Sequence, residues 1–475
     1  MEPFALTERL GRWSSGRGPL YLLLAARLRR LIDDGELPPG TALPPDRVLA
    51  AALAVGRGTV VAAYDLLSQE SRIVRRQGSG TRVAGAAATG PDTSDSPSTP
   101  VFLHLLEPPD DVLVLACAAP RCPPEVAEAY SRVLPELAAT GDDIGYHPSG
   151  THRLRLAVAE HYAARGVPTE PAQILVTNGA QQALSLLARA FVRPGDQVLV
   201  EAPTYPGALE AFREEAAVLR GLPVGLTGFE AALREHRPAL AYLIPSFQNP
   251  TGSVLPALLR RRLAAAATAA GVPLIDDEVL AGLGFPGQET PPPLAVYGDS
   301  VLSVGSLSKL VWGGLRVGWV RAPVPVVARL ARLRAVHDLG GDLPAQLVAA
   351  ELLPRLAELL ERRAVRRQAG HDHLRAELAR LLPDWEVPPV PGGQTLWVRL
   401  PHGDGTSFAQ AALRHRVAVL PGTGLDVTGG STAYLRLPFL LPQEELTTAV
   451  SRLAGAWQDY RPPPARVTAA PVMAI

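Results

Sequence analysis

Apolar residues in the first 83 positions recur at helical spacing in three stretches. The first covers residues 20–34, where apolar side chains stand three or four positions apart until Gly35 ends the pattern. Two shorter stretches, 45–53 and 59–69, are separated by a tight turn at 55–56 that contains a glycine. Two short helices joined by such a turn are typical of a helix-turn-helix.

A small hairpin is predicted directly after the third helical stretch. Ile73 and Val74 begin one arm, and residues 81–83 form the other, after a glycine-rich tip. Residues 1–83 therefore predict a helix-turn-helix followed by a hairpin wing, and the pattern alone also allows a helical cap with a solvated arginine face. The residues placed to meet DNA lie at the starts of the two short helices and beside the hairpin tip: Arg47, Arg57, Thr59, Arg75, Arg76 and Gly78.

Beyond the hairpin, the pattern changes twice. Periodicity is lost over 84–111, which begins with small and polar residues and prolines, and this predicts a flexible linker. From 112 to 460, apolar runs alternate with segments rich in alanine and leucine. The predicted buried strands are 173–177, 197–201, 240–245, 273–277 and 300–304. This alternation predicts an α/β fold with a mostly parallel sheet that has helices on both faces.

The end of this region has a different pattern. Residues from about 340 to 460 begin with helices and then show strand-like segments, which predicts a small α+β subdomain. Those segments are 395–399, 417–420 and 433–437. Residues 461–475 are rich in proline and alanine and are expected to form a frayed tail.

The composition narrows the class of protein. A length of 475 residues, with 47% hydrophobic and 19% charged residues, suits two or three globular domains. The formal net charge is zero, so a DNA-binding surface must be a local one. Cys117 and Cys122 are too few for a disulfide framework and lack metal-site spacing. No secretion signal or membrane-spanning run is visible, which predicts a cytoplasmic protein.

A single lysine, Lys309, stands in a chain whose other 45 basic residues are arginines. Arginine stays protonated and forms no imine at neutral pH, so a retained lysine indicates amine chemistry. The alternative is a surface lysine left by chance. Its neighbours favour the first interpretation, because Ser306, Ser308 and Arg316 suit a bound phosphate. The apolar run 301–304 supplies a buried strand end that would lower the pKa of the amine.

The motifs of the first 83 residues resemble the GntR-type winged helix over its full length. They are the segments 19–21, 35–40, 43–44, 47–50, 55–60 and 78–81. Pro45 and Asp46 stand where that family usually has small hydroxylated residues, and Gly56 replaces a usual serine. The resemblance implies double-stranded operator DNA as a partner, with a base preference that the sequence does not reveal.

The segment around Lys309 resembles the lysine motif of fold-type I pyridoxal-phosphate enzymes, the aminotransferase family. The resemblance implies pyridoxal 5'-phosphate as cofactor and Lys309 as the residue that forms the Schiff base. A strand followed by a helix start at 177–184 matches the cradle of the cofactor phosphate. The residues that the resemblance places around the phosphate are Gly179, Ala180, Gln181, Ser306, Ser308 and Arg316.

Further motifs follow in the order of that family. Tyr205 matches the aromatic ring that stacks on the pyridine, and Asn249 matches the donor to the phenolic oxygen of the cofactor. Asp277 matches the carboxylate that pairs with the pyridine nitrogen, with Asp276 as the alternative. The family's tyrosine just downstream is absent, since Leu280 stands there. The loss of its hydrogen bond weighs against efficient transamination.

Two more residues complete the resemblance. Arg436 matches the arginine that holds a substrate carboxylate by a bidentate pair. Tyr146 matches the tyrosine that reaches the cofactor phosphate of the partner subunit, which implies a homodimer of head-to-tail arrangement.

The fusion of these two units is similar to the MocR-like subfamily of GntR-type transcription regulators. That resemblance implies a regulator that senses an amine, an amino acid or pyridoxal phosphate itself through aldimine formation at Lys309. The alternative is an active aminotransferase with a DNA-binding appendage, which the set of Asn249, Asp277, Lys309 and Arg436 supports. A degenerate fold used only for dimerisation is disfavoured by the retained lysine.

Overall fold

The computed structural model describes residues 3–10, 13, 19–38, 40–70, 72–76, 80–84, 111–139 and 141–462. Of the linker expected at 84–111, only its two end residues lie inside these ranges. Of the tail expected at 461–475, only residues 461 and 462 do. Gly78 lies outside the described residues, as does the side chain of Arg76.

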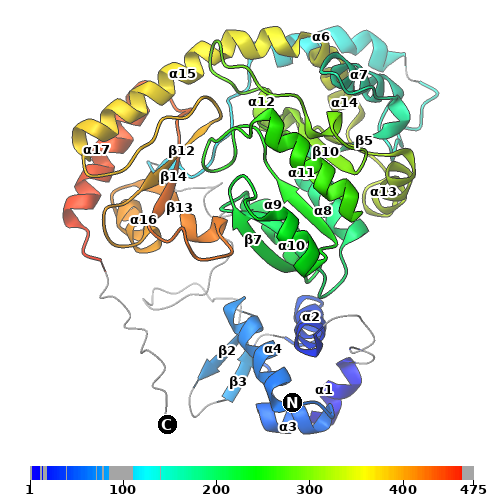
Figure 1. Ribbon diagram of the computed structural model, residues 1–475, viewed down its shortest axis with the longest axis vertical. Coiled ribbons are helices and arrows are strands. Elements are labelled where there is room, and N and C mark those ends of the chain that lie inside the picture. The colour runs from blue at the N-terminus through cyan, green and yellow to red at the C-terminus, as the bar shows by residue number, and fades with distance from the viewer. Residues whose placement is uncertain are drawn as a thin grey trace.

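The N-terminal unit has the elements that the hydrophobic pattern predicts. Its helices are α1 (Pro3–Leu10), α2 (Leu20–Asp33), α3 (Asp46–Ala52) and α4 (Arg57–Gln69). Its strands are β1 (Ala42–Leu43), β2 (Ile73–Arg76) and β3 (Gly80–Val83), which pair antiparallel in the order β1-β3-β2. Leucines from α2, α3 and α4 and the ring of Tyr64 form one core without solvent exposure. Figure 1 shows this unit in blue.

A seven-stranded sheet in the order β5-β11-β10-β9-β8-β6-β7 is the centre of the second unit. Its strands are β5 (Ile174–Thr177), β6 (Gln197–Ala202), β7 (Val218–Pro223), β8 (Leu240–Leu243), β9 (Leu274–Asp277), β10 (Val301–Ser306) and β11 (Gly318–Arg321). Strand β11 runs antiparallel to both neighbours, and the other neighbouring pairs are parallel. The predicted α/β class and mostly parallel sheet are confirmed.

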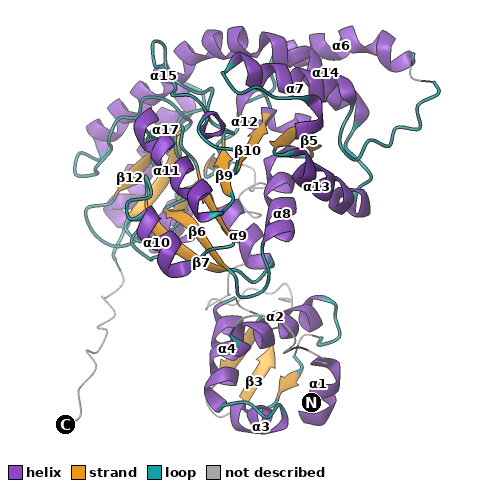
Figure 2. Ribbon diagram, turned by 45° about the vertical axis from the view of Figure 1, so that its right-hand side comes forward, coloured by secondary structure: helices purple, strands orange, loops and turns teal. Residues whose placement is uncertain are grey.

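Helices cover both faces of this sheet (Figure 2). They are α6 (Pro124–Ala138), α7 (His152–Ala164), α8 (Gly179–Phe191), α9 (Pro206–Glu214), α10 (Phe229–His236), α11 (Ala257–Ala270), α12 (Leu307–Leu310), α13 (Val324–His337) and α14 (Leu343–Leu352). Separate apolar clusters pack against the strands, one with α8, α9 and α13 and one with α10 and α11. Among the described helices, none is both long enough and apolar enough to cross a membrane.

A four-stranded sheet in the order β12-β14-β13-β4 forms the small subdomain. Its elements are β4 (Leu113–Leu115), β12 (Thr395–Arg399), β13 (Val417–Pro421), β14 (Tyr434–Pro438), α15 (Leu356–Leu381), α16 (Gly405–Arg414) and α17 (Gln443–Asp459). Strand β4 pairs in parallel with β13. The first strand of the second unit therefore lies in the sheet that its C-terminal strands form.

The boundary of the small subdomain differs from the expected position near residue 340. Residues of α14, together with Leu353, Leu356 and Leu359, pack in the large core with α6 and α7. The separate core of the small subdomain includes Leu374 and Leu378 from the second half of α15. Helix α15, yellow in Figure 1, therefore belongs to both cores and connects them. Periodicity alone showed a helix here but not which core it faces.

Candidate functional site

Five predicted residues follow the carboxyl ends of neighbouring strands. Gly179 comes after β5, Tyr205 after β6, Asn249 after β8, Asp277 ends β9 and Lys309 follows β10. All five strands run in the same direction, since β11 is antiparallel to both β5 and β10. The carboxyl edge of an open α/β sheet is where such folds bind ligands. The topology therefore brings these residues to one edge.

The amine of Lys309 is buried near other positive groups. Burial lowers the pKa of Lys309 to about 8, and the charges of Arg436 and Arg316 act in the same direction. The Nζ atom donates a hydrogen bond to the main-chain carbonyl of Ala118. A lysine with a pKa near 8 has a sizeable neutral fraction at neutral pH, and only the neutral amine is a nucleophile.

Asp277 is buried at the same edge. Burial raises the pKa of Asp277 to about 6, against the hydrogen bonds that its carboxylate accepts. The hydroxyl of Tyr242 donates to Oδ2 at 2.6 Å, and the backbone N–H of Val279 donates to Oδ1 at 3.1 Å. A cationic group beside this carboxylate would offset the cost of its burial.

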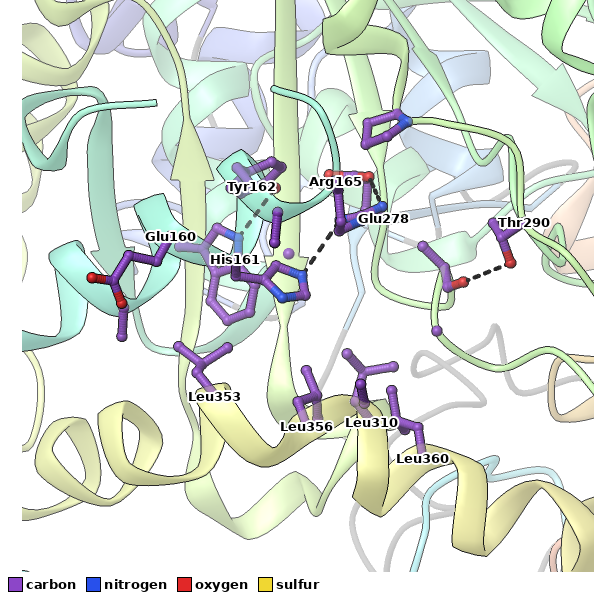
Figure 3. Close-up of a pocket in the computed structure, with 18 of the residues that line it drawn as sticks. Glu160, His161, Tyr162, Arg165, Glu278, Thr290, Leu310, Leu353, Leu356 and Leu360 are labelled. Carbon is purple, nitrogen blue, oxygen red and sulfur yellow. Dashed lines mark hydrogen bonds and ion pairs between the residues drawn. The ribbon is translucent and has the colours of Figure 1, made fainter. Parts of the chain in front are cut away.

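The residues on either side of Asp277 face elsewhere. Asp276 accepts a hydrogen bond from the backbone N–H of Leu294. Glu278 pairs with Arg165 at 2.7 Å in another cavity, which Figure 3 shows beside α7 and α15. Side chains alternate between the two faces of a strand, so Asp277 points away from both. These positions favour Asp277 over Asp276 as the partner of a ligand at this edge.

The start of α8 offers donors for an anion. Gly179 adopts a left-handed φ of +78°, and a Cβ atom there would lie 2.9 Å from the guanidinium of Arg316. Arg316 is exposed and donates to the carbonyl of Asn178 at 2.8 Å. The helix start and this guanidinium therefore lie together, an arrangement typical of phosphate sites. Ser306 and Ser308 contact each other nearby, with 3.0 Å between their hydroxyl oxygens.

Tyr205 and Gln181 are joined, which fixes the ring of Tyr205. Its hydroxyl donates to Oε1 of Gln181 at 3.0 Å, and Nε2 of Gln181 donates to the carbonyl of Gly207 at 2.8 Å. The pKa of Tyr205 is raised to about 12, mainly by burial and next by the charge of Asp277. Tyr205 thus lies near Asp277 with its hydroxyl already bonded.

Arg436 in β14 comes from the small subdomain and is 4% exposed. Its guanidinium donates to Oδ1 of Asn249 at 3.3 Å and to the main-chain carbonyl of Ala116. Its Nε atom has no partner among the described residues. Burial lowers the pKa of Arg436 to about 10. A buried guanidinium with only neutral partners has unused capacity for a carboxylate.

Tyr146 lies outside this cluster. Its ring is 62% exposed, in a loop before α7, next to Ile144 at 81%. None of the interactions among the described residues joins Tyr146 to Lys309. The structure therefore leaves this tyrosine facing solvent in a single chain.

Sequence reasoning missed some participants of the site. Tyr242 lies in a buried strand and looks like a core aromatic residue, but it is the donor to Asp277. Ala116 and Ala118 act through their carbonyl groups, which no side-chain pattern reveals. They follow β4, whose position became visible only through its pairing with β13.

In the N-terminal unit, the predicted DNA-facing residues have different surroundings. Arg47 and Arg57 are exposed near the starts of α3 and α4, and Thr59 is half-buried. Arg75 instead donates from one guanidinium nitrogen to both carboxylate oxygens of Asp46, at 2.7 and 2.9 Å, and from another to Asp65. Its guanidinium is thus engaged by two carboxylates inside the domain, although its side chain stays partly exposed, and its role at the DNA surface stays a prediction.

Comparisons with known proteins divide the chain in the same way as its two units. Residues 20–83 match the family of bacterial regulatory proteins, gntR family, and residues 113–453 match aminotransferase class I and II. The uncharacterised HTH-type transcriptional regulator YisV of Bacillus subtilis (strain 168) is 30% identical over 87% of this chain and 91% of its own length. The probable rhizopine catabolism regulatory protein MocR of Rhizobium meliloti is 31% identical over 72% of each chain.

The chain belongs to the MocR-like subfamily of GntR-type regulators. The second unit of this MocR-like protein is similar to LysN, the α-aminoadipate aminotransferase of Thermus thermophilus. The TM-score is 0.69 at 31% identity, covering 76% of this chain and 94% of that one. That structure holds N-(5'-phosphopyridoxyl)-L-leucine. Pyridoxal 5'-phosphate is the cofactor of this domain.

The residues of the MocR-like chain fit this cofactor. The helix start at Gly179 with Arg316 is a cradle that a Cβ atom would fill, and it suits the phosphate. Asp277 is a buried carboxylate, a chemistry that suits a protonated pyridine nitrogen. Lys309 is a buried amine, and its lowered pKa favours reaction with the aldehyde carbon of the cofactor. Each end of the cofactor thus has a group of matching chemistry.

Proposed function

We propose that this protein is a pyridoxal-phosphate-dependent transcription regulator that senses an amine, an amino acid or pyridoxal phosphate itself through covalent chemistry at Lys309. One observation carries the proposal: the only lysine of the chain is buried beside Arg436, in a protein that also has a winged helix. The cofactor supplies an aldehyde that bonds reversibly to amines. Lys309 holds it, Asp277 pairs with its pyridine nitrogen, and Asn249 is the donor beside the ring.

The effector site is proposed to use Arg436. A carboxylate that binds the guanidinium would displace the weaker neutral acceptor, the carbonyl of Ala116. Attachment of the cofactor would likewise release the amine of Lys309 from the carbonyl of Ala118. Residues 116–118, the capping loop, therefore respond to both events. The loop follows β4, which begins two residues after the linker to the winged helix.

A change in the capping loop would transmit the effect of the bound effector through the linker to the DNA-binding unit. Differential binding of a ligand to two arrangements of the protein is what makes a switch. The proposed domains are 1–83 for DNA, 84–111 as linker and 112–460 for the cofactor. Arg47, Arg57 and Thr59 are proposed to contact the operator, with Arg76 and Gly78 in the wing.

We infer a homodimer in which Tyr146 reaches the cofactor phosphate of the partner subunit. The ring and its neighbour Ile144 are exposed, which is costly for a large apolar surface unless another subunit covers it. Val336 at 84% and Leu339 at 45% extend the exposed apolar residues, and Gly340 packs against the backbone of His147. A site in which each subunit completes the other also couples two winged helices.

The visible spectrum of the reconstituted protein tests the sensor proposal. The holoprotein is titrated with a panel of amines and amino acids, with Lys309→Ala as the variant that has no amine. A lasting shift of the wild-type spectrum with one compound, away from the band of the Lys309-bound cofactor that Lys309→Ala lacks, supports sensing and identifies a candidate effector. If no compound shifts the spectrum and Lys309→Ala regulates like the wild type, the proposal fails.

A working aminotransferase is the second candidate. The similarity to LysN and the complete set of Asn249, Asp277, Lys309 and Arg436 favour it. Against it, Leu280 packs at the edge of the large core and has no hydroxyl for the cofactor. Release of a keto acid, with conversion of the cofactor to its amine form, would rank this function first.

A further inference from the structure

A second cavity lies on the α15 side of Lys309, and arginines dominate its charge. Its volume is about 910 Å³, and its charged lining includes Lys309, Glu125 and Glu444. The arginines, of which four come from two successive turns of α15, are Arg121, Arg362, Arg363, Arg366 and Arg367. Positive charge therefore exceeds negative charge, and we name this space the arginine cavity.

Carboxylates of the chain neutralise only part of this charge. At the exposed end of the group, Arg362 pairs with Glu125 at 3.2 Å. Arg121 pairs with Glu445 at 3.1 Å. Arg363 and Arg367 donate instead to main-chain carbonyl groups, at 3.0 and 2.6 Å. Neutral acceptors satisfy the donors but leave the charge uncompensated.

Two buried polar atoms on the wall have no partner among the described residues. They are Nε of Arg367 and Oε1 of Gln394, in residues that are 7% and 4% exposed. A buried N–H without an acceptor destabilises the folded protein unless a ligand or water supplies one. Burial and the neighbouring Arg363 lower the pKa of Arg367 to about 10, and an anion beside it would reverse that effect.

The arginine cavity lies where the two cores of the second unit meet. Leu310 and Leu359 on its wall belong to the large core, and Phe439 belongs to the small one. A third part of the wall is the segment 120–125, which follows the capping loop. A ligand held here would contact both cores and the segment that leads back to the linker.

We propose that the arginine cavity binds a small anion with at least two negative charges, carried by phosphate or carboxylate groups. The bound anion holds the small subdomain against the large core. It thereby regulates the site at Lys309 from the α15 side of that lysine. A concave site suits a small ligand better than DNA, because the guanidinium of Arg367 is buried at its wall. The binding itself does not depend on the protein being a regulator.

Calorimetry on the holoprotein tests the proposal. Borohydride reduction first fixes the cofactor on Lys309, so that its phosphate fills the cradle at Gly179 and added anions cannot bind there. Inorganic phosphate and citrate are then titrated separately. We expect saturable binding of at least one, and the tighter of the two tells whether the ligand class is phosphorylated or polycarboxylate.

Variants test whether the measured heat comes from anion binding in the arginine cavity. We expect Arg362→Gln/Arg366→Gln to weaken binding at least ten-fold, with the fold checked by circular dichroism. Arg380→Gln is the matched control, an exposed arginine on the same helix outside the cavity, and should bind as the wild type does. Amide exchange in residues 356–381 should slow when the anion is bound.

Several outcomes would overturn the proposal. One is the absence of saturable binding of both anions to the reduced holoprotein. Equal weakening in Arg380→Gln would show a general effect of surface charge. If the double variant loses affinity for DNA but keeps that for anions, the arginines form a DNA-contact surface. Anion binding without any change in amide exchange would show that the anion does not hold the two cores together.

Discussion

At the scale of single residues, Lys309 has the most direct pH dependence. Its folded-state pKa of about 8 lies below the ordinary 10.5, because burial disfavours the charged amine. The neutral fraction therefore rises about ten-fold per pH unit up to pH 8 and then levels off. We predict that the rate of cofactor attachment to the apoprotein follows this curve, as measured by stopped-flow absorbance.

The contradicting result for Lys309 is a rate that keeps rising through pH 10, as it would for an exposed lysine. Pyridoxal phosphate also titrates, so its reaction with a free lysine derivative is measured over the same pH range. The ratio of the two rates isolates the contribution of the protein.

Arg436→Lys separates charge from geometry at the proposed effector site. Lysine keeps a positive charge but cannot form the two parallel hydrogen bonds of a guanidinium with a carboxylate. A charge-assisted hydrogen bond contributes about 1.5–3 kcal/mol, so amino acids should bind about 10–100-fold more weakly. Amines without a carboxylate should react as before. Spectral titration of the holoprotein measures both, and equal weakening of the two classes would exclude a specific role for Arg436.

At the scale of elements, the start of α8 is tested by Gly179→Ala. The residue has a left-handed φ of +78°, and its Cβ would lie 2.9 Å from Arg316. Left-handed alanine costs about 1–2 kcal/mol, and the contact would also displace the guanidinium. We predict a loss of cofactor affinity of at least ten-fold, measured by fluorescence titration.

Gly166→Ala is the matched control for this variant. Gly166 has a similar φ of +82° after α7, and a Cβ there meets nothing within 4 Å. It should lower the free energy of unfolding by a similar amount and leave cofactor affinity unchanged. Loss of affinity in both variants would mean that general instability, not the cradle, is the cause.

In the winged helix, Arg57 and Arg75 have opposite predicted effects. Arg57 is exposed at the first position of α4, whereas Arg75 binds Asp46 and Asp65. We expect Arg57→Ala to weaken DNA binding and to reduce the slope of log K against log salt by about one, with no loss of stability. Fluorescence anisotropy at several salt concentrations measures this.

Arg75→Ala should instead destabilise the domain by on the order of 1 kcal/mol, because its ion pairs are partly exposed. Its salt slope should stay that of the wild type. A reduced salt slope in Arg75→Ala would show that Arg75 contacts DNA directly, as the sequence suggested.

The elements also show how far the sequence could predict the structure. Local periodicity indicated the helices α2, α3 and α4 and the strands β5, β6, β8, β9 and β10, since one stretch of chain contains the whole signal. The partly buried β7 was not among them. Strands β4 and β11 were missed because non-local pairing creates them: β4 joins β13 across about 300 residues of chain. The Asp46–Arg75 pair was missed for the same reason, although Asp46 stood out as a departure from the family.

At the scale of the whole molecule, motif order assigned the candidate site residues, and the strands bring five of them to one edge of the sheet. What the sequence did not reveal is what the site residues contact. The capping loop between Lys309 and Arg436 acts through backbone carbonyls, and the arginine cavity exists only where two cores meet. Both features belong to the proposed regulation, which depends on contacts between separate parts of the protein.

Operator binding by the wild type and by Lys309→Ala, each with and without pyridoxal phosphate, is the decisive measurement for control through Lys309. Fluorescence anisotropy with the same DNA gives the four affinities. We predict that the cofactor changes the DNA affinity of the wild type by at least five-fold and that of Lys309→Ala hardly at all. A cofactor effect of the same size in both proteins, or in neither, would contradict control of DNA binding through Lys309.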